Sequence, residues 1–212
     1  MNKITLILGG ARSGKSAYAE KLATESGLPV TYIATAQVYD DEFKQRVQHH
    51  KDRRPKHWQL IEAPHCLRDA LQPQGLSPQN IPAEAGYSYV KANTPGHPLS
   101  NSLRELDSPC NHADATKIVD CLTLWLAQCI CPECAPPEGV DWAQQRAAFL
   151  ELLPTLQGHI ILVSNEVGMG IVPLGEINRQ FQDEQGRLNQ AVASIADEVV
   201  FVAAGLPLKL KG

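Results

Sequence analysis

Eight residues near the amino terminus constrain this chain more than any other segment. Gly9 to Ser16 reads Gly-Gly-Ala-Arg-Ser-Gly-Lys-Ser, which matches the pattern GxxxxGK[ST] at every fixed position. The run Lys3 to Leu8 before it is short and rich in Ile and Leu, as a buried strand is, and the residues after it have helical character. The segment therefore predicts a strand, a phosphate-binding turn and a helix, in that order.

The residue types in this loop suit a triphosphate. Glycines let the backbone wrap closely around phosphate oxygens, and the amino end of the following helix adds partial positive charge. Lys15 is placed to reach the β- and γ-phosphates of ATP or GTP, and the Ser16 hydroxyl to ligate Mg²⁺. The nucleotide-binding residues predicted in the loop are Gly9, Gly10, Ala11, Arg12, Ser13, Gly14, Lys15 and Ser16.

The rest of the chain alternates between patterns typical of strands and of helices. We predict strands at 30–34, 58–61, 117–121, 159–163, 199–203 and 207–211, and helices at 16–26, 40–53, 122–130 and 142–153. Late in the chain we expect Gly186 to separate a helix at 175–183 from a second one carrying Leu188, Val192 and Ile195. The alternation predicts an α/β fold of the P-loop NTPase, RecA-like type: a mostly parallel sheet with helices on both faces.

One stretch breaks the alternation. Six of the 15 prolines fall between Pro73 and Pro109, and apolar periodicity is lost there. We therefore predict a single domain over 1–212 with a loop-rich insertion at about 72–116.

Composition narrows the classes of partner. The net charge is -4 and the one basic cluster, 51–56, is short, which argues against a nucleic-acid partner. No apolar run approaches the roughly 20 residues that span a bilayer, and no signal peptide is recognisable, so a soluble cytoplasmic protein is expected. Cys129, Cys131 and Cys134 include a CxxC pair, which with Cys110 or His112 would make a zinc site; the missing second pair favours reduced cysteines instead.

A phosphate loop requires a carboxylate for its metal ion. Asp120 ends the predicted strand at 117–121, and Glu166 follows the predicted strand at 159–163. We favour Asp120 as the ligand for nucleotide or metal and give Glu166 a supporting role. The chain lacks the [NT]KxD motif with which regulatory GTPases read guanine, because Thr116-Lys117-Ile118-Val119 fails at its last position.

Further segments resemble a known family, the bifunctional adenosylcobinamide kinase/adenosylcobinamide-phosphate guanylyltransferases of cobalamin biosynthesis. The resemblance covers nearly all of the chain except about 72–116. Beyond the phosphate loop it rests on Tyr32-Ile33-Ala34-Thr35-Ala36, the histidine segment Arg46 to Pro55, Trp58, Asp120-Cys121-Leu122-Thr123, Val163 to Pro173, Gly186 to Gln190 and Ala196 to Val199.

The resemblance implies an activity and a set of site residues. Adenosylcobinamide would be phosphorylated with ATP or GTP, and GMP from GTP would then pass through a covalent histidine intermediate, at the position of His49. The resemblance also implies a homo-oligomer, with a trimer expected. The further GTP-binding positions that it implies are Thr35, Ala36, His50, Lys51, Asp52, Arg53, Glu62 and Asp120.

The chemistry of His49 is consistent with that role. Imidazole is mostly neutral at cellular pH and is a reasonable nucleophile toward phosphorus. On a helix, Arg46, His49 and Arg53 share one face, so two guanidiniums would flank the imidazole and steady phosphate charge.

Two other functions fit the phosphate loop without the histidine segment. One is a small-molecule kinase that performs no guanylyl transfer, and the other is a nucleotide-gated binding module without turnover. Arg179 and Arg187 suit either phosphate contacts or exposed helix charges, and 168–170 suits either a substrate loop or a plain turn. The surface that binds the corrinoid is not apparent from the sequence.

Overall fold

A computed structural model of the chain describes residues 2–36, 54–65, 67–72, 88–90, 115–131 and 141–212. Its strands form one eight-stranded sheet in the order β4-β3-β2-β5-β6-β1-β7-β8. The six inner strands are parallel, and the two edge strands β4 and β8 run antiparallel to their neighbours. The strands are β1 (Lys3–Gly9), β2 (Val30–Ala34), β3 (Gln59–Glu62), β4 (Ser88–Val90), β5 (Thr116–Asp120), β6 (His159–Asn165), β7 (Glu198–Ala203) and β8 (Leu206–Lys211).

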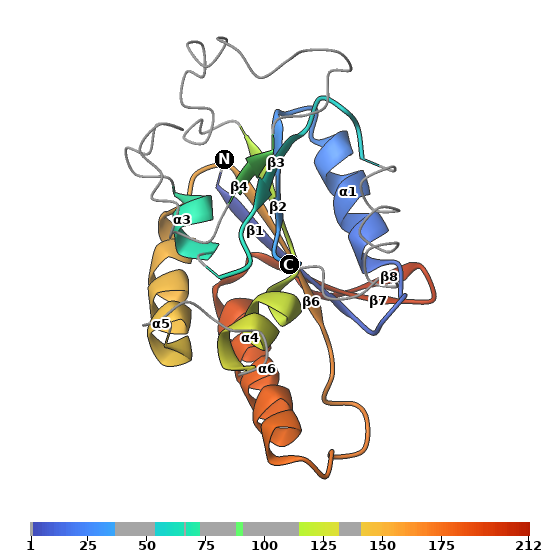
Figure 1. The fold of residues 1–212 in the computed structure, drawn as a ribbon. Coiled ribbons are helices and arrows are strands. Elements are labelled where there is room, and N and C mark those ends of the chain that lie inside the picture. Colours follow the sequence, from blue (N-terminus) through green and yellow to red (C-terminus); the bar gives the residue numbers. More distant parts are fainter. Residues whose placement is uncertain (1, 37–53, 66, 73–87, 91–114, 132–140) are drawn as a thin grey trace.

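Helices cover both faces of this sheet, as Figure 1 shows, with α1 on one face and the other helices on the opposite face. Because side chains alternate between faces along a strand, neighbouring residues of β1 enter different cores. Leu6 packs under the group of helices, whereas Ile7 packs under α1. The helices are α1 (Lys15–Glu25), α3 (Leu67–Leu71), α4 (Leu122–Ile130), α5 (Trp142–Leu152) with the 3₁₀ turn η3 (Leu153–Thr155), and α6 (Glu176–Ile195).

The parallel register brings the carboxyl ends of the six inner strands to one edge of the sheet. Ala34 of β2 pairs with Glu62 of β3 on one side and with Asp120 of β5 on the other. Asp120 in turn pairs with Val163 of β6, which lies opposite Ile7, two residues before the phosphate loop. Ligands of open α/β sheets bind at this edge.

These elements confirm the predicted fold class and nearly all of its strands. One helix prediction was wrong: α6 runs without a break from Glu176 to Ile195, through Gly186. Gly186 costs the helix about 1 kcal/mol relative to alanine, but Gln185 and Leu188 on either side of it are fully buried, and their packing holds the helix together.

Two short pieces of structure fall inside the stretch predicted as a loop-rich insertion. Ser88–Val90 forms β4, which extends the sheet beyond β3, and Thr116 already belongs to β5. The predicted helix at 40–53 lies outside the described residues. Within the parts that are described, no helix is long and apolar enough to cross a membrane.

Candidate active site

The phosphate loop is a tight turn that tolerates little bulk. A side chain at Gly9 would place its Cβ 2.4 Å from the carbonyl oxygen of Val202 and 2.6 Å from Ser13 Oγ. Gly14 has a φ of 98°, and a Cβ there would lie 3.1 Å from Gly205 Cα. Gly205 N also donates a 2.8 Å hydrogen bond to Ser13 O. The turn between β7 and β8 therefore supports the loop, and glycine is required where the two approach.

Lys15 lies across this loop. Its Nζ donates a 3.0 Å hydrogen bond to Gly10 O, and its side chain is largely buried. Burial lowers the pKa of the ammonium group, while Cys121 and Asp120 act in the opposite direction. The lysine is thus held beside the glycine backbone and within electrostatic range of the carboxylate at the end of β5.

Asp120 is oriented from the neighbouring strand. The Tyr32 hydroxyl donates a 2.6 Å hydrogen bond to Asp120 Oδ2, and the Arg54 guanidinium lies 4.1 Å from the centre of the Tyr32 ring. Burial raises the pKa of the Tyr32 phenol well above its ordinary value, and the charge of Asp120 and the hydrogen bond to it add to this. Tyr32 therefore remains a donor, and its bond fixes one oxygen of the carboxylate.

Thr35 joins the ends of β2 and β5. Its hydroxyl donates to Cys121 O at 2.7 Å and accepts from Cys121 N at 2.8 Å. The Thr35 carbonyl accepts a 2.6 Å hydrogen bond from Gln128 Nε2, and the residue is fully buried. In this structure the Thr35 side chain shapes the backbone beside Asp120.

A buried polar network holds the end of β6 against α6. Ser164 Oγ donates to Asn189 Oδ1 at 2.7 Å, and Gln185 Nε2 donates to the same two side chains at 2.9 and 3.0 Å. Asn189 Nδ2 donates to Asn165 O at 3.0 Å, and Asn165 N donates to Thr123 Oγ1 at 2.7 Å. These bonds fix the strand end immediately before Glu166.

Glu166 connects this strand end to the phosphate loop. Its backbone N–H donates a 3.1 Å hydrogen bond to Gly9 O, and its carboxylate accepts one of 3.0 Å from Gly168 N. Glu166 therefore stabilises its own turn beside the loop. Its supporting role toward the nucleotide or metal ion stays a prediction.

The residues present provide suitable ligands for Mg²⁺. The ion prefers hard oxygen ligands, and the Ser16 hydroxyl and the Asp120 carboxylate are of this kind. Oδ2 of that carboxylate accepts the hydrogen bond from the Tyr32 hydroxyl. Within the loop, Ser13 Oγ is buried and has no hydrogen-bond partner among the described residues. An unpartnered buried hydroxyl beside the glycine backbone is consistent with a loop built for an oxygen-rich anion.

The structure brings one part of the predicted site together. The predicted residues that line the carboxyl edge of the sheet are Gly9, Gly10, Ala11, Arg12, Ser13, Gly14, Lys15, Ser16, Thr35, Ala36, Glu62 and Asp120. The other predicted residues, His49, His50, Lys51, Asp52 and Arg53, lie outside the described residues, as do Cys110, His112 and Cys134. Cys129 and Cys131 are free thiols, and the described residues contain no group of three or more His, Cys, Asp or Glu side chains that could hold a metal ion.

Sequence reasoning gave no role to Tyr32 or to Asn189. The signal for Tyr32 was its position two residues before the end of β2. The register places the end of β2 beside the end of β5, where Asp120 lies. No local pattern distinguishes Asn189 from an exposed helix residue, because its partners lie 24 and 25 residues away in β6.

A parallel sheet, a glycine loop at the carboxyl end of β1 and a lysine within electrostatic range of an aspartate define a P-loop nucleotide-binding protein. Comparison with known proteins gives the family. Residues 5–81 and 96–210 match the family model described as cobinamide kinase / cobinamide phosphate guanyltransferase. The chain belongs to this family and is a bifunctional kinase and guanylyltransferase.

Curated relatives match over almost their full length. The bifunctional adenosylcobalamin biosynthesis protein CobP of Pseudomonas aeruginosa is 44% identical over 207 residues, which are 98% of this chain and 96% of that protein. The bifunctional adenosylcobalamin biosynthesis protein CobU of Salmonella typhimurium is 34% identical, over 97% of this chain and 98% of the relative. The CobU protein of Escherichia coli is 31% identical over the same shares.

Proposed function

We propose that this protein phosphorylates adenosylcobinamide with ATP or GTP and then transfers GMP from GTP, through His49, to give adenosyl-GDP-cobinamide. Family membership supports the two activities. The observation that supports nucleotide binding is the phosphate loop. There the Lys15 ammonium donates a hydrogen bond to Gly10 O, within electrostatic range of Asp120.

In the kinase step the chain positions the triphosphate and stabilises its charge. Lys15 Nζ exchanges its bond to Gly10 O for oxygens of the β- and γ-phosphates, and the loop N–H groups donate to the same groups. Ser16 and Asp120 would hold Mg²⁺, which neutralises charge on the transferred phosphoryl group. The hydroxyl of the aminopropanol arm attacks the γ-phosphorus, the bond to the β-phosphate oxygen breaks, and the nucleoside diphosphate leaves.

In the guanylyl step His49 forms the intermediate. A neutral imidazole nitrogen attacks the α-phosphorus of GTP, and pyrophosphate leaves as the N–P bond forms. A phosphate oxygen of the phosphorylated corrinoid then attacks that phosphorus, the N–P bond breaks, and the imidazole is regenerated. Arg46 and Arg53 would steady the developing phosphate charge. Arg54, next to Arg53 in sequence, lies over the Tyr32 ring, whose hydroxyl donates to Asp120.

We further propose that the chain works as a homo-oligomer, a trimer by resemblance to its family. Light scattering of the purified protein measures this directly, and a monomeric mass at working concentration would contradict it.

The covalent intermediate gives the sharpest test of the function. The protein is incubated with α-labelled GTP and no corrinoid, and label on the protein should be acid-labile and base-stable. His49→Ala should abolish this label, whereas the matched neighbour His50→Ala should retain measurable labelling. Label that survives His49→Ala, or none on the unaltered protein, would count against the proposed mechanism. Phosphorylated cobinamide without protein label would indicate a kinase that performs no guanylyl transfer.

A further inference from the structure

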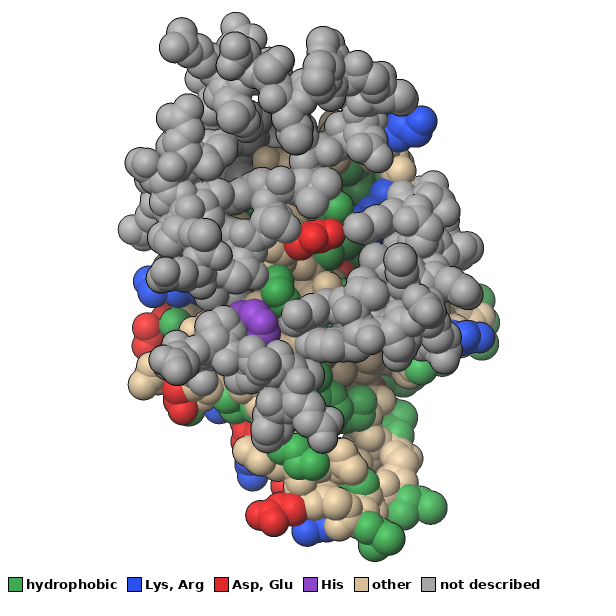
Figure 2. Space-filling model, viewed as in Figure 1, with side chains coloured by type: hydrophobic (Ala, Val, Ile, Leu, Met, Phe, Trp, Pro, Cys, Tyr) green, Lys and Arg blue, Asp and Glu red, His purple; other side chains and the backbone are tan. Residues whose placement is uncertain are grey.

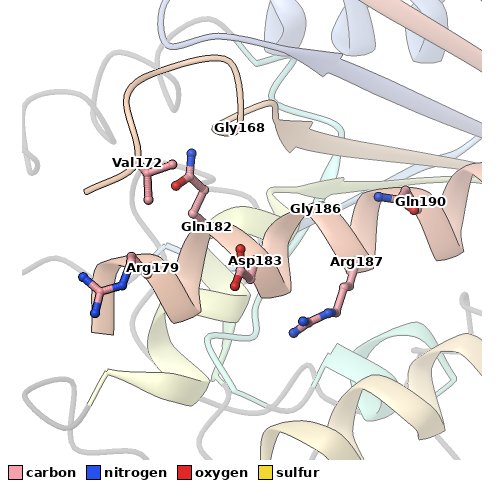
Figure 3. A pocket seen from close by; sticks show the side chains of 8 residues that line it. All are labelled: Gly168, Val172, Arg179, Gln182, Asp183, Gly186, Arg187 and Gln190. Atoms are coloured by element: carbon pink, nitrogen blue, oxygen red, sulfur yellow. The ribbon is translucent and has the colours of Figure 1, made fainter. Parts of the chain in front are cut away.

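A groove of about 540 Å³ runs between α6 and the segment that follows β6 (Figure 3). The helix contributes a continuous face, on which Gln182, Gly186 and Gln190 recur with the helical period. The segment after β6 contributes Gly168 and Val172 on the other side. The volume lies within the range of small-molecule sites, about 300–1,000 Å³.

The segment that forms one wall of the groove starts beside the phosphate loop. Glu166 N donates to Gly9 O, so the segment after β6 starts in direct contact with the loop that would hold the phosphates. Gln182 Nε2 donates to Val167 O at 3.2 Å, and Arg179 donates to the carbonyl oxygens of Pro173 and Leu174. Both ends of the segment are thus tied to α6, and the space between them is held open.

Gly186 makes the floor of the groove flat. A Cβ at this position would meet nothing within 4 Å, so packing does not require glycine there. Its φ also lies outside the left-handed range, so the backbone does not require glycine either. Glycine in a helix interior nevertheless costs about 1 kcal/mol relative to alanine. A bare helix surface at this point is explained by the close approach of a ligand.

Apolar side chains lie beside the groove, whose own lining is mostly polar and charged, with Val172 as its one apolar side chain. Ile171 and Leu174 are 96% and 98% exposed, and Met169 and Val172 are also exposed. Figure 2 shows hydrophobic side chains gathered at the lower end of the molecule, where this segment and the start of α6 lie. Exposed apolar side chains grouped in this way mark a surface that a partner covers.

We propose that this groove binds the corrinoid acceptor, an inference that rests on the proposed function. A corrinoid is a broad macrocycle with apolar faces and a rim of amide groups. The exposed apolar side chains beside the groove suit the faces of the ring, and the side chains of Gln182, Gln190 and Arg187 in its lining suit its amides. Gly168 in the groove lies two residues along the chain from Glu166, which contacts the nucleotide loop, so the phosphate-accepting arm can extend toward that loop from this end.

Two variants obstruct the groove by different means. Gly186→Leu fills its floor with a good helix-forming residue, and Val172→Glu places a charge on its apolar side in an exposed segment. Gln180→Leu is the matched control, because Gln180 is exposed on the same helix and does not line the groove. Each variant is assayed for the KM of cobinamide at saturating nucleotide, for the KM of nucleotide, and for protein label from α-labelled GTP without corrinoid. Thermal unfolding and mass by light scattering are measured alongside.

Both groove variants should raise the KM of cobinamide about tenfold or more, with the KM of nucleotide, the protein label and the mass unchanged. Gln180→Leu should behave as the unaltered protein. An unchanged KM of cobinamide in folded variants would overturn the proposal. A raised KM accompanied by a changed mass would also overturn it, because the face would then be a contact between copies of the chain. Failure of the proposed function is separate: the unaltered protein would not phosphorylate cobinamide at all.

Discussion

The Tyr32 hydroxyl donates a 2.6 Å hydrogen bond to Asp120 Oδ2 across two neighbouring parallel strands. The Arg54 guanidinium covers the other side of the same ring, 4.1 Å from its centre. Arg54 belongs to the histidine segment, Arg46 to Pro55, and directly follows Arg53. One buried phenol therefore contacts both the carboxylate expected to hold the metal ion and the end of the segment expected to perform guanylyl transfer.

Tyr32→Phe should raise the Mg²⁺ concentration that the kinase reaction requires, without unfolding the protein. The ring and its contact with Arg54 remain, and only the bond to the carboxylate is lost. A hydrogen bond to a charged group contributes about 1.5–3 kcal/mol, so we expect the kinase rate at limiting Mg²⁺ to fall about tenfold or more. Added Mg²⁺ should restore part of that loss. The measurement is the kinase rate as a function of Mg²⁺ concentration.

Tyr18→Phe provides the control for that experiment. Tyr18 is partly buried on α1 and packs against the same core as Tyr32. Its substitution should leave the dependence on Mg²⁺ unchanged. If both variants respond to Mg²⁺ in the same way, Tyr32 has no particular part in orienting Asp120.

Lys15→Met should abolish kinase activity and stabilise the protein at neutral pH. Burial lowers the pKa of Lys15 below 10.5 in the folded protein, so the folded state holds the proton less firmly than the unfolded chain. The stability of the unaltered protein therefore rises with pH between the lowered pKa and 10.5. The variant lacks this rise, so its advantage should be largest at neutral pH and shrink as the pH rises toward 10.5.

The difference between the two proteins, from urea unfolding across pH, is the quantity to measure. Burial raises the pKa of the Cys121 thiol to about 12, so stability from this group is present below pH 9 and lost above it. Lys15 is among the charges that lower this pKa, so the loss differs between the two proteins, and they are compared below pH 9, where the thiol is protonated in both. A variant less stable than the unaltered protein at pH 7 would show that the bond to Gly10 O outweighs the burial of the charge.

Two adjacent glycines of the loop should respond differently to alanine. At Gly9 the new Cβ would meet Val202 O at 2.4 Å, whereas at Gly10 it would meet nothing within 4 Å. Gly9→Ala should therefore destabilise the fold by about 1–3 kcal/mol, in the range of overpacked sites. Gly10→Ala should have the same melting temperature as the unaltered protein. Thermal unfolding of the pair checks this, and equal melting temperatures would contradict the observed contact.

Much of the site was predictable because its signals are local. Gly9 to Ser16 carries a complete motif between a hydrophobic run and a helix, and the end of β5 placed Asp120 at the same edge of the sheet. The bond from Tyr32 to Asp120 depends on register between strands that are 88 residues apart in sequence, which no local pattern specifies.

The interior of α6 shows where a local sequence signal predicts the wrong structure. Gly186 favours a helix end when it is considered alone. The helix continues because residues on both sides of Gly186 are anchored to β6, through Gln185 and Asn189. Contacts distant in sequence thus outweighed a local penalty of about 1 kcal/mol. The same continuity gives the groove its straight helical wall.

Asn189→Leu tests that anchor. The leucine would leave Ser164 Oγ without its acceptor and Asn165 O without its donor, and Gln185 Nε2 would lose one of its two acceptors. Buried polar groups left without partners cost about 1–3 kcal/mol each, so the free energy of unfolding should fall by at least about 2 kcal/mol. Urea unfolding measures the loss, and Gln180→Leu, exposed on the same helix, should change it by less than about 0.5 kcal/mol. If Asn189→Leu lowers the free energy of unfolding no more than Gln180→Leu does, the network does not hold α6 to the sheet.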